Sequence, residues 1–113
     1  MAVKRYDEMK VDILPNGAQR RMGYTDHLMM VIIDFDQGPQ AEPDPPHAHP
    51  HEQVSYVAEG EIYFFLDDQR QRLGPGDIFL VPPDIPHTIQ LLTKHVRLVD
   101  CFNPIRQDFL EKM

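Results

Sequence analysis

The sequence predicts a small all-β protein, a barrel or sandwich of six to eight short strands with one short helix at the C-terminal end. Its 113 residues allow one domain, or at most a tight pair of very small ones, and we expect a single domain over 1–113. Eleven prolines and six glycines are spread along the chain and leave no room for long helices. Short apolar segments lie between these breaks, about ten residues apart, which is the spacing of an antiparallel barrel or sandwich.

The expected strands are short, rich in β-branched or aromatic residues, and bounded by turn residues. In chain order they are 28–35, 53–58, 62–66, 77–81, 88–92 and 96–102, with weaker candidates at 11–14 and 19–23. Glu59, Gly60 and Glu61 read as a hairpin-like turn between two of these strands. The proline-rich stretch 37–46 predicts a stiff, extended loop, because each proline restricts both itself and the residue before it.

One helix is expected near the C-terminal end. Asn103 suits an N-cap, and Pro104 suits the first helical position. Ile105 and Phe109 then lie one turn apart on a single face. We expect this face to pack across one end of the barrel.

Charge and composition exclude several classes of protein. The formal net charge of −7 argues against a nucleic acid or an anionic membrane as partner, because both bind basic surfaces. No segment approaches the ~18 consecutive apolar residues of a membrane span. A single cysteine, Cys101, excludes an intrachain disulfide. The first residues carry a basic pair without an apolar run, so we expect a soluble, cytoplasmic protein.

The segment PHAHPHEQ, which is rich in histidine and proline, contains candidate metal ligands. Alternate residues of an extended strand share a face, so His47 and His49 point the same way and can hold one metal ion. Gln53 has the same parity, and a bend near Pro50 would return its side-chain oxygen to the same point. His87 ends the rigid turn PPDIPH, whose limited freedom suits a metal ligand.

These side chains suit one divalent transition metal ion, such as zinc, nickel, iron or manganese. Each histidine taken alone could equally be a surface residue of a proline-rich loop. His51 and Glu52 fall between the expected ligands and are expected at the rim, with Glu52 as the ligand if the bend differs by one residue. His27 and His95 belong to no such pattern and are expected to be ordinary surface or barrel-end histidines.

The two segments resemble the paired motifs of the cupin superfamily. In the first motif a His-x-His pair is followed by three or four residues, a glutamate, six residues and a glycine, which His47, His49, Gln53 and Gly60 match except for the glutamate. The second motif is matched at Gly76, Pro82 and His87. The resemblance covers nearly the whole chain and implies a single-domain cupin β-barrel, a double-stranded β-helix or jelly roll.

The sequence departs from the cupin pattern at several residues. Asp84 and Leu91 replace a glycine and an asparagine of the second motif, and Gly38 lies eight residues before His47 instead of five. Gln53 replaces the glutamate, and this departure matters chemically. Three histidines and an amide leave the full dipositive charge on the ion, which favours a Lewis acid over a redox centre.

The segment VRLVDCF places a carboxylate in an apolar row. Val96, Leu98, Asp100 and Phe102 share one face of this strand. If that face points inward, Asp100 is a buried carboxylate near a cation and a candidate general acid or base. The opposite register would leave Asp100 solvated at an edge.

The run DCFNPIR, together with HPHEQ, is similar to the small pectin-degradation cupins. These proteins linearise 4,5-unsaturated uronates to a 5-keto-4-deoxyuronate. The resemblance implies three histidines and a glutamine as metal ligands and an Asp-x-Phe-x-x-x-Arg active-site pattern. The residues that match are His47, His49, Gln53 and His87 as ligands, and Asp100, Phe102 and Arg106 in the active site.

That resemblance implies a metal-dependent isomerase in carbohydrate metabolism. Asp100 would move a proton, Arg106 would bind the carboxylate of the sugar, and Phe102 would pack against its face. The net charge counts modestly against an anionic sugar. Two other readings stay open at this point: a metal-dependent dioxygenase, and a non-catalytic module that binds a sugar or another small ligand.

A homodimer is expected from the strand pattern. If Ser55, Val57, Ile62, Phe64 and Leu66 face inward, the aromatic residues Tyr56, Tyr63 and Phe65 lie on the outer face. An outer aromatic patch on so small a domain indicates an interface, and a symmetric dimer is the commonest solution. With the opposite register these aromatic residues would belong to the core.

Overall fold

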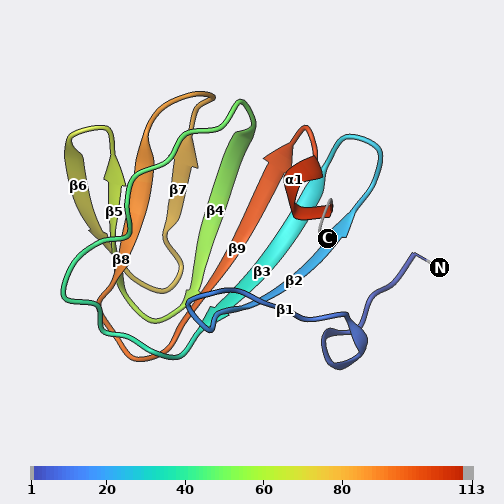
Figure 1. Ribbon diagram of the computed structural model, residues 1–113, viewed down its shortest axis with the longest axis horizontal. Coiled ribbons are helices and arrows are strands. Elements are labelled where there is room, and N and C mark those ends of the chain that lie inside the picture. The colour runs from blue at the N-terminus through green and yellow to red at the C-terminus, as the bar shows by residue number, and fades with distance from the viewer. Residues whose placement is uncertain (1, 111–113) are drawn as a thin grey trace.

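The structure, a computed structural model, describes residues 2–110. These residues form two antiparallel sheets that close into a β-barrel, with one short helix at its side (Figure 1). The elements are η1 (Tyr6–Glu8), β1 (Asp12–Ile13), β2 (Gln19–Tyr24), β3 (Met29–Phe35), β4 (Glu52–Glu59), β5 (Ile62–Leu66), β6 (Gln69–Leu73), β7 (Ile78–Val81), β8 (His87–Leu91), β9 (Val96–Asn103) and α1 (Gln107–Leu110). The all-β class expected from the sequence is confirmed.

The six-stranded sheet has the order β1-β2-β3-β9-β4-β7, and the three-stranded sheet has the order β6-β5-β8. All of the expected strands are present. β6 was not expected, because Gln69–Leu73 reads QRQRL and is polar on both faces. Among the residues described, no helix is long and apolar enough to span a bilayer.

The expected hairpin-like turn at Gly60 is wrong. β4 pairs with β7 and β9, whereas β5 pairs with β6 and β8, so the chain changes sheet at this glycine. Gly60 has a φ of +80°, and a Cβ atom there would lie 2.2 Å from the carbonyl oxygen of His95. The crossover therefore requires glycine.

The expected start of the helix is also wrong. Asn103 is the last residue of β9 and pairs with Glu52, so it extends the sheet and does not cap a helix. α1 begins at Gln107. The apolar face was expected correctly, because Ile105 and Phe109 both pack on a cluster of buried side chains. The members of that cluster are Met29, Val31 and Phe102.

A larger core fills the space between the two sheets. Its buried members are Val57, Ile62, Phe64, Phe79, Val81, Leu91, Val96 and Leu98. Phe64 of β5 stacks on Phe79 of β7 with ring centroids 4.3 Å apart. This contact joins the three-stranded sheet to the six-stranded sheet through aromatic packing.

The proline-rich segment runs beside β8. Its backbone amides at Gly38, Gln40 and Asp44 donate to carbonyl oxygens of the chain around β8, at 2.9 to 3.2 Å. Pro39 and Pro43 stand between these bonds, where no amide is needed. The segment thus covers the edge of the three-stranded sheet and carries the chain directly to His47.

The N-terminal segment is held on the six-stranded sheet by a buried carboxylate. Asp34 accepts hydrogen bonds from Arg97 Nε at 2.6 Å and from the Tyr6 hydroxyl at 2.7 Å. Arg21 stacks on the Tyr6 ring, with its Cζ atom 3.9 Å from the ring centroid. Although burial opposes it, hydrogen bonding by Arg97 and Tyr6 leaves the pKa of Asp34 below its ordinary value.

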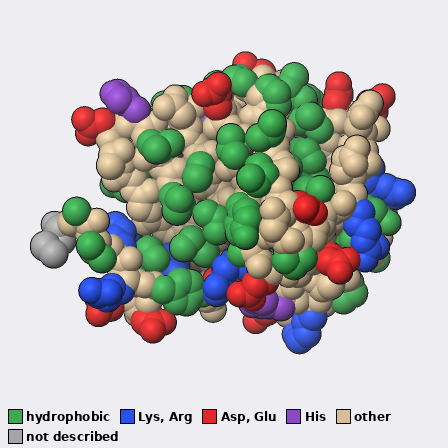
Figure 2. Space-filling view, turned by 180° about the vertical axis from the view of Figure 1, so that it is seen from behind, with side chains coloured by type: hydrophobic (Ala, Val, Ile, Leu, Met, Phe, Trp, Pro, Cys, Tyr) green, Lys and Arg blue, Asp and Glu red, His purple; other side chains and the backbone are tan. Residues whose placement is uncertain are grey.

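The outer face of the six-stranded sheet is apolar. Hydrophobic side chains gather on this side of the molecule in Figure 2, and the large exposed ones on β3, β4 and β7 are Met30, Val54, Tyr56, Ile78 and Leu80. The inward residues of β4 and β5 are those the sequence indicated. The expected aromatic patch is nevertheless divided, because Tyr56 lies on one sheet and Tyr63 and Phe65 lie half-buried on the other.

Candidate metal centre and active site

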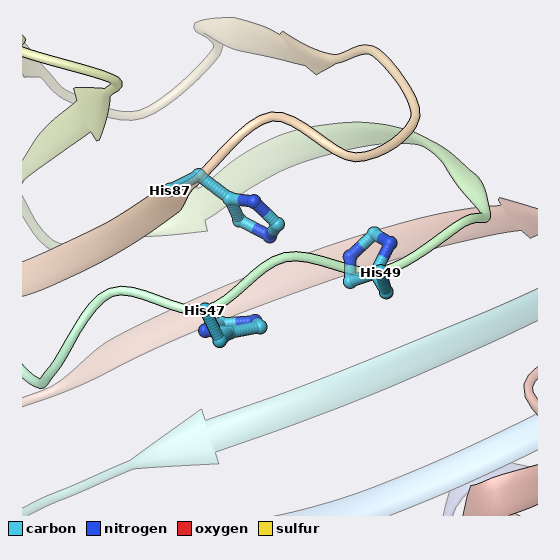
Figure 3. A group of neighbouring side chains, drawn as sticks. All are labelled: His47, His49 and His87. Atoms are coloured by element: carbon cyan, nitrogen blue, oxygen red, sulfur yellow. The ribbon is translucent and has the colours of Figure 1, made fainter.

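Three histidines meet at one end of the barrel. His47 and His87 form an isolated antiparallel bridge, in which each backbone amide donates to the carbonyl of the other, at 3.0 and 2.9 Å. One nitrogen from each of His47, His49 and His87 lies within 4.8 Å of the others. Figure 3 shows the three rings turned toward a common space.

The turn before His87 is bonded to the histidine segment. The Asp84 amide donates to the carbonyl of His49 at 2.8 Å, so the two loops are held together by backbone. Asp84 has a φ of +66°. Aspartate is one of the few residues that tolerate this left-handed conformation, which explains how it can replace the glycine of the motif.

The histidine rings are oriented by the backbone. His87 Nδ1 donates to the carbonyl of Ile85 at 2.9 Å, and His49 Nδ1 donates to that of His51 at 3.0 Å. In the neutral ring each Nε2 atom then presents a lone pair. Among the residues described, His87 Nε2 is buried and has no hydrogen-bond partner.

Gln53 completes a convergent set of lone pairs. Its Oε1 atom lies 3.0 Å from His49 Nε2. Two acceptors at this distance repel each other unless a cation lies beside them. The donor set, three imidazoles and one amide oxygen, is one that a divalent transition metal accepts, so these residues fit such an ion.

Burial favours the neutral form of His47 and His87, the form that binds a metal. Burial, together with the neighbouring rings of His47 and His49, lowers the pKa of His87 to about 4, although its bond to Ile85 acts the other way. Burial also lowers the pKa of His47. A metal would therefore displace few protons from this site near neutral pH.

Asp100 lies on the inward face of β9, as the apolar alternation indicated. It is 6% exposed, and burial raises its pKa to about 6, opposed by a hydrogen bond from Ser55 and by the charge of Arg106. The Ser55 hydroxyl donates to Asp100 Oδ1 at 2.6 Å and accepts from Gln53 Nε2 at 2.9 Å. The sequence placed Ser55 on the inner face but gave no sign of this role.

Arg106 is buried against aromatic rings. Its Cζ atom lies 4.9 Å from the Phe102 centroid and 4.1 Å from that of Phe109. Nε and Nη2 bind both carboxylate oxygens of Asp108, at 3.0 and 2.8 Å. Asp108 was not expected in the site, and it leaves Nη1 of Arg106 for another partner.

One cavity of about 310 Å³ brings these groups together. The predicted site residues that line it are His47, Gln53, His87, Asp100, Phe102 and Arg106. Arg20 of β2 also lines it, with its Cζ atom 4.2 Å from the Phe109 centroid and Nη2 3.6 Å from Asp12 Oδ2. Arg20 lies in one of the weaker strand candidates, where no motif distinguished it.

The remaining histidines and Glu52 lie outside the cluster. Strand alternation turns Gln53 inward and Glu52 outward, so Glu52 is exposed and does not join the three histidines. His51 lies beside His49 at a centroid distance of 5.5 Å. His27 is exposed, and His95 Nε2 pairs with Glu59 at the surface, at 2.9 Å.

Comparison with known proteins finds similarity along almost the whole chain. The family model described as Cupin domain matches residues 33–102. Pectin degradation protein KdgF of Dickeya dadantii (strain 3937) is 32% identical over 113 residues, which covers 96% of this chain and 100% of that protein. Acireductone dioxygenase of Candida albicans (strain WO-1) is 38% identical over 63 residues, 50% of this chain and 35% of that protein.

Two solved structures are also similar to this chain along almost its whole length. The crystal structure of an RmlC-like cupin from Shewanella frigidimarina NCIMB 400 has a TM-score of 0.87 and 38% identity, covering 96% of each chain. The structure of KdgF from Halomonas sp. has a TM-score of 0.83 and 32% identity, covering 93% of this chain and 94% of the other.

Proposed function

The chain belongs to the cupin family, and from this premise we propose that it is a metal-dependent enzyme that opens the ring of a 4,5-unsaturated uronate. One observation carries the proposal: a buried carboxylate, Asp100, lines the same cavity as Arg106 and two of the clustered histidines, His47 and His87. The similarity to the two KdgF proteins over nearly their full length supports the substrate class.

Asp100 is the proposed acid and base. Its pKa of about 6 makes both the carboxylate and the acid accessible near neutral pH. As the carboxylate it would take the proton of the hemiacetal hydroxyl while the bond between C1 and the ring oxygen breaks. The enolate released at C5 gains a proton at C4, so the product is an isomer of the substrate, the 5-keto-4-deoxyuronate.

Arg106 and Phe102 are proposed to hold the sugar. Nη1 of Arg106 is the guanidinium nitrogen that Asp108 leaves available for the uronate carboxylate. The Phe102 ring lies beside Arg106 and offers a flat apolar surface to the face of the sugar. The cavity has the size of a small-molecule site.

His47, His49, Gln53 and His87 are the proposed ligands of one divalent ion, such as zinc, nickel, iron or manganese. When bound, the ion would act as a Lewis acid toward the sugar oxygens.

Incubation with 4,5-unsaturated galacturonate tests the proposal. The wild-type protein loaded with metal should remove the double-bond absorbance rapidly and without oxygen consumption, whereas Asp100→Asn should not. Decay at the non-enzymatic rate with every metal would refute it. The dioxygenase alternative, motivated by the match to acireductone dioxygenase over half of this chain, predicts oxygen uptake with a diketone substrate instead.

The homodimer is also proposed, through the apolar outer face of the six-stranded sheet. The exposed side chains of neighbouring strands are directly opposite each other there, as Val54 is to Leu80 and Tyr56 to Ile78. A second copy of the chain is the proposed occupant, because a symmetric dimer covers one such face with another.

A further inference from the structure

A line of three polar contacts, two of them hydrogen bonds, joins the histidine cluster to the candidate acid and base. Gln53 Oε1 faces His49 Nε2 at 3.0 Å, Gln53 Nε2 donates to Ser55 Oγ at 2.9 Å, and the Ser55 hydroxyl donates to Asp100 Oδ1 at 2.6 Å. Ser55 is 1% exposed, so water does not compete for its hydroxyl. β4 and β9 place Ser55 directly opposite Asp100, which is why their side chains meet.

Which atom donates in each of the two hydrogen bonds follows from which atoms carry protons. An amide nitrogen can donate but not accept, so Ser55 Oγ must accept from Gln53 and has its own proton left for Asp100. Asp100 Oδ1 is thereby an acceptor. Among the residues described, Oδ2 makes no hydrogen bond, and it is the oxygen left for the cavity that Asp100 lines.

We propose that Ser55 is a positioning residue that turns the oxygen of Gln53 toward the metal and the Oδ2 oxygen of Asp100 toward the substrate. The inference rests on the metal site of the proposed function. Without the Ser55 hydroxyl, the buried amide nitrogen of Gln53 has no acceptor, and rotation of the amide toward His49 Nε2 would satisfy it. That rotation removes the ligand oxygen.

The same geometry accounts for glutamine in place of the usual glutamate. A carboxylate has an oxygen at both ends and needs no orienting partner. Its second oxygen would, however, accept the Ser55 proton, and Asp100 would then lose its donor. Glutamine at this site lets one serine serve both the metal ligand and the acid-base group.

The test measures zinc affinity by competition with a chromogenic chelator, in wild type, Ser55→Ala, Gln53→Glu and the double variant. Ser55→Ala should weaken zinc binding by about tenfold or more in the wild-type background, the usual effect of removing a partner that orients a ligand. In the Gln53→Glu background the same change should alter zinc affinity less than about threefold. Ser55→Thr keeps the hydroxyl and should retain affinity, and circular dichroism verifies that each variant folds.

Equal losses from Ser55→Ala in both backgrounds would overturn the inference, because a merely structural serine does not depend on the ligand it touches. An unchanged zinc affinity in Ser55→Ala would also overturn it. The measurement needs no sugar. If zinc affinity changes as expected but the uronate is not turned over, the role of Ser55 is retained and the proposed activity is refuted. If the uronate is turned over but zinc affinity does not change as expected, the proposed activity is retained and the role of Ser55 is refuted. A wild-type protein that binds no zinc, nickel, iron or manganese would refute both.

Discussion

Replacing Asp100 by asparagine should change how stability depends on pH. Burial raises the pKa of Asp100 from 3.8 to about 6, so the folded protein holds a proton that the unfolded chain releases between these values. Stability contributed by this group is therefore present at low pH and lost as pH rises through about 6. A shift of about 2 units at about 1.4 kcal/mol per unit corresponds to about 3 kcal/mol in full, and about 2 kcal/mol of it falls between pH 4 and 7.

The measurement is urea unfolding of the metal-free protein at several pH values, for wild type and Asp100→Asn. Asparagine keeps a side-chain oxygen for the Ser55 hydroxyl but does not titrate. The difference between the two unfolding free energies cancels the titration of the histidines and of Asp34. Wild type should lose about 2 kcal/mol relative to the variant as pH rises from about 4 to 7. A difference that is flat across this range, or that grows in favour of wild type, would refute the reasoning.

Three further predictions concern the metal, the N-terminal segment and the outer face. His87→Ala should abolish bound metal by elemental analysis while the fold persists by circular dichroism, and full metal content would contradict the ligand set. Asp34→Asn should destabilise the protein by about 2 kcal/mol in urea, because the buried Arg21 and the partly exposed Arg97 would lose the carboxylate that they share. A loss below about 0.5 kcal/mol would show that the pair is unimportant. Leu80→Glu, on the exposed outer face, should convert a dimer to a monomer by light scattering, and an unchanged mass would exclude this interface.

Sequence patterning predicted the fold wherever burial leaves an alternating signature. β9 alternates buried and half-buried residues from Val96 to Phe102, and it was expected almost to the residue. β6 has no such signature, because it is an exposed edge strand of polar residues. The crossover at Gly60 looked like a hairpin because a tight turn and a change of sheet both need a glycine with positive φ.

The residues of the candidate site were predictable where a motif spaced them, and their partners were not. His47, His49 and His87 come together as their spacing indicated. Ser55, Asp108 and Arg20 belong to no sequence motif. They are distinguished only by their contacts, which are with residues distant in the sequence for Ser55 and Arg20 and with a residue two positions away for Asp108. A buried serine opposite a buried carboxylate on paired strands is the signal that could have identified Ser55.

The proposed metal ligands come from both sheets, and this has a mechanical consequence. His87 begins β8 of the three-stranded sheet, whereas Gln53 belongs to β4 of the six-stranded one. An ion bound by residues of both strands would hold the two sheets together at the mouth of the barrel. Its removal would allow the strands to open locally there. Two residues further along the strands, where Phe79 lies opposite Ser55 and Phe64 lies opposite Ile89, the stacking of Phe64 on Phe79 is apolar packing that does not depend on metal. Amide hydrogen exchange should therefore quicken at the starts of β4 and β8 on chelation and stay slow around the aromatic stack, so that the rim of the barrel responds to metal supply while the core next to it keeps the chain folded.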